Sequence, residues 1–236
     1  RYGQKLAARR VSRTIMLGSA PTVRAQNIRG IESSRIRLGI VQPGESIADF
    51  NDALNTLRGS LAYLYTDPSG NRYWYDTRPT LRKTATDRAT QIAPSDMTYE
   101  IERRLREFRK EGPFAGLHVC PNTSNDVSDE QAVRLVILKT EDTYKQGKDR
   151  SKAITRAEEI LNNRGSAPRV YRNMLAFVAP DQDGLNSLER AVRELLAWQS
   201  IKTDSETLNL DAAQNTETLN NINRSDETVK LRLKET

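Results

Sequence analysis

Residues 61–75, LAYLYTDPSGNRYWY, decide how the first third of the 236-residue chain is organised. Apolar or aromatic side chains occupy every second position on both sides of a break: Leu61, Tyr63, Tyr65, Tyr73 and Tyr75. Trp74 belongs to the opposite face, and the intervening DPSGN at residues 67–71 has the residue types that form tight turns. The stretch therefore predicts a β-hairpin.

Three segments before the hairpin have helical patterns. Residues 2–20 and residues 47–57 carry apolar side chains three and four positions apart, which predicts a helix in each. Ser46, with Asp49 three residues later, is typical of a helix N-terminus. Residues 32–40 either alternate like a strand or line one helical face, and we favour a short helix. Three helices followed by a hairpin is the element order of a winged helix, whose third helix can enter a DNA groove.

Positive charge is concentrated in the first half of the chain. Residues 1–110 contain 20 Lys and Arg against 11 Asp and Glu, whereas the remaining residues contain 17 against 20. Such asymmetry is typical of a surface that meets nucleic acid or an acidic partner. Candidate DNA contacts are the basic residues at the end of the third helix, at the hairpin tip and beyond it: Arg58, Arg72, Arg78, Arg82 and Lys83. Asp49 and Asp52 on the third helix would repel phosphates, so docking to a protein is the alternative.

Residues 79–111 predict two charged helices that connect this module to the next. The expected buried stripes are Leu81, Ala85, Ala89 and Ile92 in one helix, and Tyr99, Ile101, Leu105 and Phe108 in the other. Arginines in the second helix either face a phosphate backbone or alternate with Glu100, Glu102 and Glu107 on a solvated face.

Residues 112–203 predict a small α/β module. Short apolar runs at residues 117–120, 133–138 and 174–179 predict strands, and residues 151–161 predict a helix between the last two. A strand, helix and strand in this order imply neighbouring parallel strands. Because the middle run is apolar on both faces, we expect helices on both sides of the sheet, with residues 185–198 forming one of them.

Complete catalytic motifs are missing from the α/β module. Gly147-Lys148 is the only approach to a phosphate-binding loop, but Asp142 and Asp149 stand where glycine and a hydroxyl residue are required. His118 and Cys120 share a strand face and are too few for a zinc site, so we expect core residues. If the module were an independent enzyme, ligands would bind at the carboxyl ends of its strands. The residues at those ends are Cys120, Pro121, Asn122, Lys139, Thr140, Pro180 and Asp181.

Composition and the chain ends add further expectations. No apolar run approaches the roughly 18 residues of a membrane span, and the single cysteine suits a reducing cytoplasm. The chain begins at Arg1 and not at methionine, so we expect a piece of a larger protein. Residues 204–236 form a polar tail with a heptad-like pattern, which is either a helix that needs a partner or a disordered segment. The expected domains are residues 1–78, 79–111, 112–203 and 204–236.

Five segments together resemble a known family. They are RTIMLGSAP at residues 13–21, RGI at 29–31, QPGE at 42–45, YWY at 73–75 and RVYRNMLAFV at 169–178. Their order resembles the part that follows the nucleotide-binding core in large predicted AAA+-type ATPases of bacteria and archaea. That family is labelled as of unknown function and is often encoded in anti-phage defence islands.

The resemblance implies an intact protein that hydrolyses ATP with Mg²⁺ and works with nucleic-acid-processing or defence partners. It covers at least residues 9–210, and it carries over no ATP-site residue because the phosphate-binding loop is missing. Arg172 and Asn173 match the family segment without an assigned role. We therefore expect an α+β chain, with a winged-helix-like module followed by a mostly parallel α/β module, that serves a larger ATPase as an interaction and coupling portion without its own cofactor.

Overall fold

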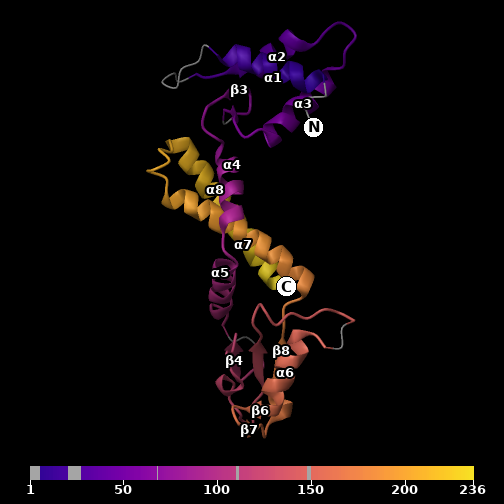
Figure 1. The fold of residues 1–236 in the computed structure, drawn as a ribbon, viewed down its shortest axis with the longest axis vertical. Helices are drawn as coiled ribbons and strands as arrows, with labels where there is room; N and C mark the ends of the chain where they lie inside the picture. Colours follow the sequence, from indigo (N-terminus) through magenta and orange to yellow (C-terminus); the bar gives the residue numbers. More distant parts are fainter. Residues whose placement is uncertain (1–5, 21–27, 68, 110–111, 148–149) are drawn as a thin grey trace. The chain divides into compact units, whose positions relative to one another are not determined.

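The computed structural model describes residues 6–20, 28–67, 69–109, 112–147 and 150–236. The chain forms two compact units, residues 1–84 (unit 1) and residues 85–236 (unit 2) (Figure 1). The division falls inside one helix, α4 (Leu81–Gln91), at the start of the predicted connector. Helices combine with a small antiparallel sheet in unit 1 and a small parallel sheet in unit 2, so the predicted mixture of α and β structure is confirmed.

Unit 1 combines three helices with a three-stranded antiparallel sheet. The helices are α1 (Leu6–Ser19), α2 (Ser33–Ile40) and α3 (Ile47–Ser60). The strands are β1 (Ile31–Glu32), β2 (Leu64–Thr66) and β3 (Arg72–Tyr75), in the order β1-β3-β2. The hairpin and the helices are confirmed, although residues 2–5 of the expected first helix lie outside the described residues. The strand β1 was not predicted.

In β3 the predicted alternation is confirmed, whereas in β2 it is shifted by one residue. Tyr65 lies directly opposite Trp74, and the two rings stack with centroids 5.8 Å apart. Cross-strand partners share a face, so Leu64, opposite Tyr75, belongs to the other face. Leu64 and Tyr73 are buried against the helices. The core face of β2 is therefore set by Leu64, and the predicted face of Tyr63 and Tyr65 was wrong.

Gly30 joins the segment before β1 to the sheet in a backbone conformation that favours glycine. Its φ of +76° lies in the left-handed region. A Cβ at this position would also collide with the carbonyl oxygen of Tyr73 on the neighbouring strand. The pairing of β1 with β3 therefore requires a residue without a side chain.

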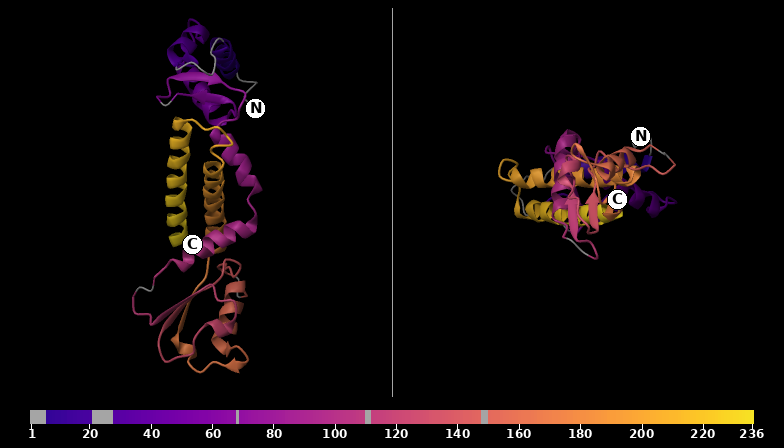
Figure 2. Two further views of the ribbon diagram at one scale, coloured as in Figure 1. Left: turned by 90° about the vertical axis from the view of Figure 1, so that its left-hand side faces the viewer. Right: turned by 90° about the horizontal axis from the view of Figure 1, so that it is seen from below.

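Three long helices form one part of unit 2: α5 (Pro94–Arg106), α7 (Gln182–Thr203) and α8 (Ala212–Glu235). Figure 2 shows α8 (yellow) alongside α7 (orange). The helices α7 and α8 are antiparallel. The amide of Asp181, at the start of α7, donates to the carbonyl oxygen of Thr236, at the end of α8. Near the other end of the pair, Lys202 of α7 donates to the side chain of Asn215 of α8. Their shared core contains Met97, Ile101, Leu185, Leu188, Ala191, Val192, Leu195 and Val229. The polar tail is thus a helix, and its partners are α7 and α5.

The buried stripe of α5 differs from the predicted one. Met97 and Ile101, four positions apart, face the core. Tyr99 is 66% exposed because it lies two positions before Ile101, which turns its side chain to the far side of the helix. The prediction of Tyr99 as a buried residue was wrong.

The other part of unit 2 is a three-stranded parallel sheet. Its strands β4 (Gly116–Val119), β5 (Arg134–Ile137) and β8 (Leu175–Val178) lie in the order β4-β5-β8. The helix α6 (Lys152–Asn162) follows β5, so the predicted parallel pairing is confirmed. Small elements complete the part: η1 (Ser124–Asp126), β6 (Asn163–Arg164), β7 (Ala167–Pro168) and η2 (Arg172–Met174).

The helix α6 covers this sheet on the face of Val136. The core there joins Val136, Leu175 and Phe177 to Ala153 and Ile160 of α6. The prediction that α7 covers the sheet was wrong, because its buried residues pack against α5 and α8 instead. Within the described residues, none of the helices is both long and apolar enough to cross a bilayer.

Candidate functional site

Two of the predicted DNA-contacting arginines lie at the carboxyl end of α3. A Cβ placed on Gly70, in the hairpin turn, would be 3.4 Å from Nη1 of Arg58. A Cβ placed on Gly59 would be 3.9 Å from Nη1 of Arg82. Both guanidinium groups therefore lie close to the last turn of α3, where the helix dipole favours cations.

Arg78 and Lys83 extend this basic group along the chain, and all four side chains are exposed. The hydroxyl of Tyr65 donates to the carbonyl oxygen of Pro79 at 2.9 Å, and the amide of Thr80 donates to the carbonyl oxygen of Ala62 at 2.7 Å. These bonds fix the segment beyond β3 against the hairpin. We name Arg58, Arg78, Arg82 and Lys83 the α3 edge.

Arg72 occupies a different environment from the other predicted contacts. It is the first residue of β3, and its Nε donates to the carbonyl oxygen of Arg29 at 2.9 Å. One Nη donates to the carbonyl oxygen of Gly30 at 2.7 Å, and the other pairs with Glu32 at 2.6 Å. The guanidinium thus ties β3 to the segment around β1, which is a structural role.

The exposed face of α3 is acidic before its last turn. Asp49 and Asp52 are exposed, and Asp49 lies in the first turn. Two carboxylates would repel a phosphate backbone placed along this face. Any contact with nucleic acid would therefore use the carboxyl end of α3 and the flank of the hairpin.

The arginines of α5 are engaged in ion pairs. Arg104 lies 2.7 Å from Glu100 and also pairs with Asp226 of α8, and Arg103 binds both Glu100 and Glu107. The side chains of Arg104 and Glu100 are only 9% exposed. The arginines pair with carboxylates, as in the second predicted arrangement, but the Glu100–Arg104 pair is largely buried and does not lie on the predicted solvated face.

The strand-end residues of unit 2 use their polar groups within the fold. The carboxylate of Asp181 accepts hydrogen bonds from the amides of Asp183 and Gly184 at 3.0 and 2.9 Å, which caps α7. Arg156 of α6 donates to the carbonyl oxygens of Pro121 and Asn122 at 3.2 and 2.6 Å. These hydrogen bonds stabilise helix and loop ends.

Cys120 is a core residue, as predicted. It is 4% exposed, its φ is +51°, and burial raises the pKa of its thiol to about 11. A thiol protonated at neutral pH is a poor nucleophile. Burial, and then the charge of Arg134, lower the pKa of His118, so this imidazole is neutral. Among the described residues, no three His, Cys, Asp or Glu side chains form a group suited to a metal.

Arg169 is a buried arginine that the sequence reasoning missed. Its side chain has no exposed surface and donates to four backbone carbonyl oxygens: those of Ser124, Val127, Ser128 and Ile160. Asp129, beside it, accepts from the amides of Val170 and Tyr171 at 2.8 and 2.9 Å. The neighbouring Arg172 and Asn173 are exposed on η2. The resembling segment is thus anchored by Arg169.

Searches among protein families, curated proteins and solved structures give no match to this chain. Its function is therefore argued from its residues and their geometry.

Proposed function

We propose that this chain is a non-catalytic interaction portion of a larger AAA+-type ATPase, in which unit 1 contacts duplex DNA through the α3 edge. The ATPase context is supported by the resemblance of five ordered segments between residues 13 and 178. In this proposal ATP and Mg²⁺ bind elsewhere in the intact protein. Its partners are the rest of the ATPase chain, DNA and proteins of a defence system.

One observation carries the DNA proposal. Arg58 of the last turn of α3 lies beside the hairpin turn at Gly70, and Arg82 lies beside Gly59 in the same last turn of α3. The order of helices and strands, with the sheet order β1-β3-β2, is compatible with a winged helix, in which the third helix and hairpin contact DNA. Unit 1 also carries 14 Lys and Arg against 6 Asp and Glu. A basic edge of this kind suits a phosphate backbone.

The expected mode of binding is independent of DNA sequence. Arginine and lysine contacts to phosphates set the position of a protein on the duplex and carry no sequence information. Asp49 and Asp52 disfavour close approach of the backbone along the rest of α3. We propose that nucleotide-driven movement in the intact protein changes how this edge meets DNA.

The DNA proposal is tested with the full 236-residue chain and a fluorescent duplex at several salt concentrations. The Arg58→Ala, Arg78→Ala, Arg82→Ala triple variant should weaken binding and reduce the salt slope by about 2–3, because each phosphate contact contributes about 0.9. The matched control removes three arginines of unit 2, Arg106, Arg190 and Arg232, and should leave the slope unchanged. The proposal would be contradicted by an affinity for DNA that does not change with salt concentration, or by an equal loss of affinity in the two triple variants.

The ATPase context is tested separately on the full-length protein. It should release phosphate from ATP in the presence of Mg²⁺, whereas the 236-residue chain alone should not. Turnover by the chain alone would show that it is an independent enzyme, whatever its affinity for DNA.

A further inference from the structure

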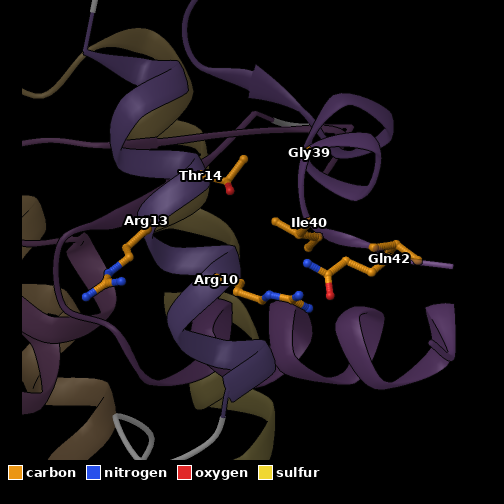
Figure 3. A pocket seen from close by; sticks show the side chains of 7 residues that line it. Arg10, Arg13, Thr14, Gly39, Ile40 and Gln42 are labelled. Carbon is orange, nitrogen blue, oxygen red and sulfur yellow. The ribbon is translucent and has the colours of Figure 1, made fainter. Parts of the chain in front are cut away.

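A groove of about 220 Å³ lies between α1 and α2 in unit 1 (Figure 3). Its lining comes from α1, from the end of α2 and from the residues just after it: Arg10, Arg13, Thr14, Gly39, Ile40, Val41 and Gln42. None of these residues belongs to the α3 edge. The groove is therefore a second surface of unit 1, built from other elements.

Gly39 lines the groove where α1 and α2 come close together. Gly39 is exposed, and a Cβ placed there would lie 3.4 Å from Cγ2 of Thr14, so the two helices approach closely at this point. Arg10 reaches from α1 toward the side of Ile40 and Gln42 in Figure 3. Both carboxylate oxygens of Glu45 lie 2.8 Å from Nη1 of Arg10, and this ion pair fixes the Arg10 guanidinium at the groove.

Both helices have an exposed leucine close in sequence to residues that line the groove. Leu17 is 76% exposed and lies one turn after Arg13 and Thr14, on the same side of α1. Leu38 is 86% exposed and directly precedes Gly39. A single exposed leucine is ordinary, but two beside a groove are typical of an interaction surface.

The charge around the leucines is positive. The sequences of α1 and α2 contain five arginines and no aspartate or glutamate. Arg13 lines the groove, and Arg35 lies one turn before Leu38 and Gly39. Neither arginine pairs with a carboxylate among the residues that the structure describes. Glu45, the nearest acidic residue in the chain after α2, is occupied by Arg10 and by the amide of Gln42.

We propose that the α1–α2 groove binds an acidic amphipathic helix of a partner protein. Apolar side chains of such a helix, spaced at three and four residues, would enter the groove between Leu17 and Leu38. Its carboxylates would meet Arg13 and Arg35 at the rim. The exposed leucines favour a protein over a nucleic acid, because phosphates and sugars gain little from aliphatic side chains.

The experiment uses the full 236-residue chain and a designed fluorescent peptide of about four helical turns, with leucines at helical spacing flanked by glutamates. Two further peptides act as probes of specificity. One keeps the leucines and replaces each glutamate by lysine, and the other keeps the composition but scrambles the leucine spacing. Fluorescence anisotropy should show binding of the first peptide and at least about ten-fold weaker binding of the others.

Variants of the chain locate the binding. The Leu17→Gln, Leu38→Gln pair and the Arg13→Glu, Arg35→Glu pair should each weaken binding of the acidic peptide by about ten-fold or more. All four side chains are exposed, so the fold should be retained. Met16→Gln and Arg37→Glu are the matched controls, because exposed Met16 lies on the side of α1 turned away from Thr14, and exposed Arg37 lies on the side of α2 turned away from Gly39 and Arg35. They should change binding by less than about two-fold.

Three outcomes would overturn this proposal. The acidic peptide does not bind, the scrambled or lysine peptide binds as well, or the groove variants bind the acidic peptide as the parent chain does. A duplex DNA that displaces the peptide, and whose binding falls in the arginine pair but not in the leucine pair, would instead identify the groove as a nucleic-acid surface. The α3 edge variants should leave peptide binding unchanged, which separates this result from the DNA proposal.

Discussion

Nε of Arg169 donates a hydrogen bond of 2.7 Å to the carbonyl oxygen of Ile160 in the last turn of α6. The same guanidinium donates to carbonyl oxygens of the loop between β4 and β5, including that of Val127 at 3.0 Å. One buried side chain therefore joins the end of α6 to a loop more than 30 residues earlier in the chain. Arg169 thus holds α6 and the β4–β5 loop together through buried hydrogen bonds.

Arg169→Met should lower the free energy of unfolding of unit 2 by about 3–5 kcal/mol. Methionine fills much of the space, but it removes the guanidinium donor of four carbonyl oxygens and the cation beside Asp129. Urea denaturation followed by circular dichroism measures the change. Arg172→Met, at an exposed position three residues later, should stay within about 0.5 kcal/mol of the parent chain. Equal stability of the two variants would rule out the anchoring role.

The Glu100–Arg104 pair should make unit 2 sensitive to acid. The hydrogen bond from Arg103 lowers the pKa of Glu100 below its ordinary value of 4.5, burial opposes this, and the bond from Arg104 adds to it. Because the folded state has the lower pKa, this stabilisation is complete above pH 4.5 and is lost as pH falls through the folded value.

Glu100→Gln should therefore reduce the loss of stability between pH 5 and pH 3, as measured by urea denaturation at a series of pH values. Glu158→Gln changes an exposed residue of α6 and should preserve the acid dependence of the parent chain. An unchanged slope in the Glu100→Gln variant would mean that other carboxylates dominate acid unfolding.

Cys120 should resist alkylation in the folded chain. Burial keeps the pKa of the thiol near 11, so the reactive thiolate is scarce at pH 8, and only 4% of the residue is exposed. Iodoacetamide labelling, followed by mass spectrometry, should be at least about ten-fold slower than in guanidinium-unfolded protein. Fast labelling of the folded chain would show that the thiol is accessible and would contradict its place in the core.

Arg72→Ala should loosen the hairpin. The variant loses the hydrogen bonds to the carbonyl oxygens of Arg29 and Gly30 and the pair with Glu32, at a cost of about 1–3 kcal/mol. Hydrogen exchange of residues 61–75 should become faster. Arg58→Ala should leave this exchange unchanged, because no hydrogen bond of the sheet depends on Arg58. If both variants exchange alike, Arg72 does not hold the sheet.

The helices and the hairpin could be predicted because their signals are local. Apolar residues at three- and four-residue steps and a turn sequence between alternating aromatic residues need no knowledge of the rest of the chain. The face of β2 could not be predicted in this way, because residues 63, 64 and 65 are all apolar or aromatic. The pairing of Leu64 with Tyr75 and the helices beneath decide it.

The surroundings of the arginines could not be predicted from sequence. Arg72 lies 43 residues after Arg29, whose carbonyl oxygen it binds, and Arg169 lies 45 residues after Ser124. The residues next to each arginine in the sequence do not indicate which distant carbonyl oxygens it binds. The groove was missed for the same reason, since it forms where Thr14 and Gly39 meet. Its only sequence signal is the absence of acidic residues from two neighbouring helices.

The constraint at Gly30 provides a tool for dissecting the protein. Gly30→Ala would place a methyl group against the carbonyl oxygen of Tyr73, in a backbone conformation that alanine adopts with difficulty. The substitution removes no charge and alters no side chain of the basic surfaces. The substitution should therefore disrupt the sheet of unit 1 and leave its charges in place. A cellular defect of this variant would be due to the loss of the folded sheet and not to the loss of positive charge.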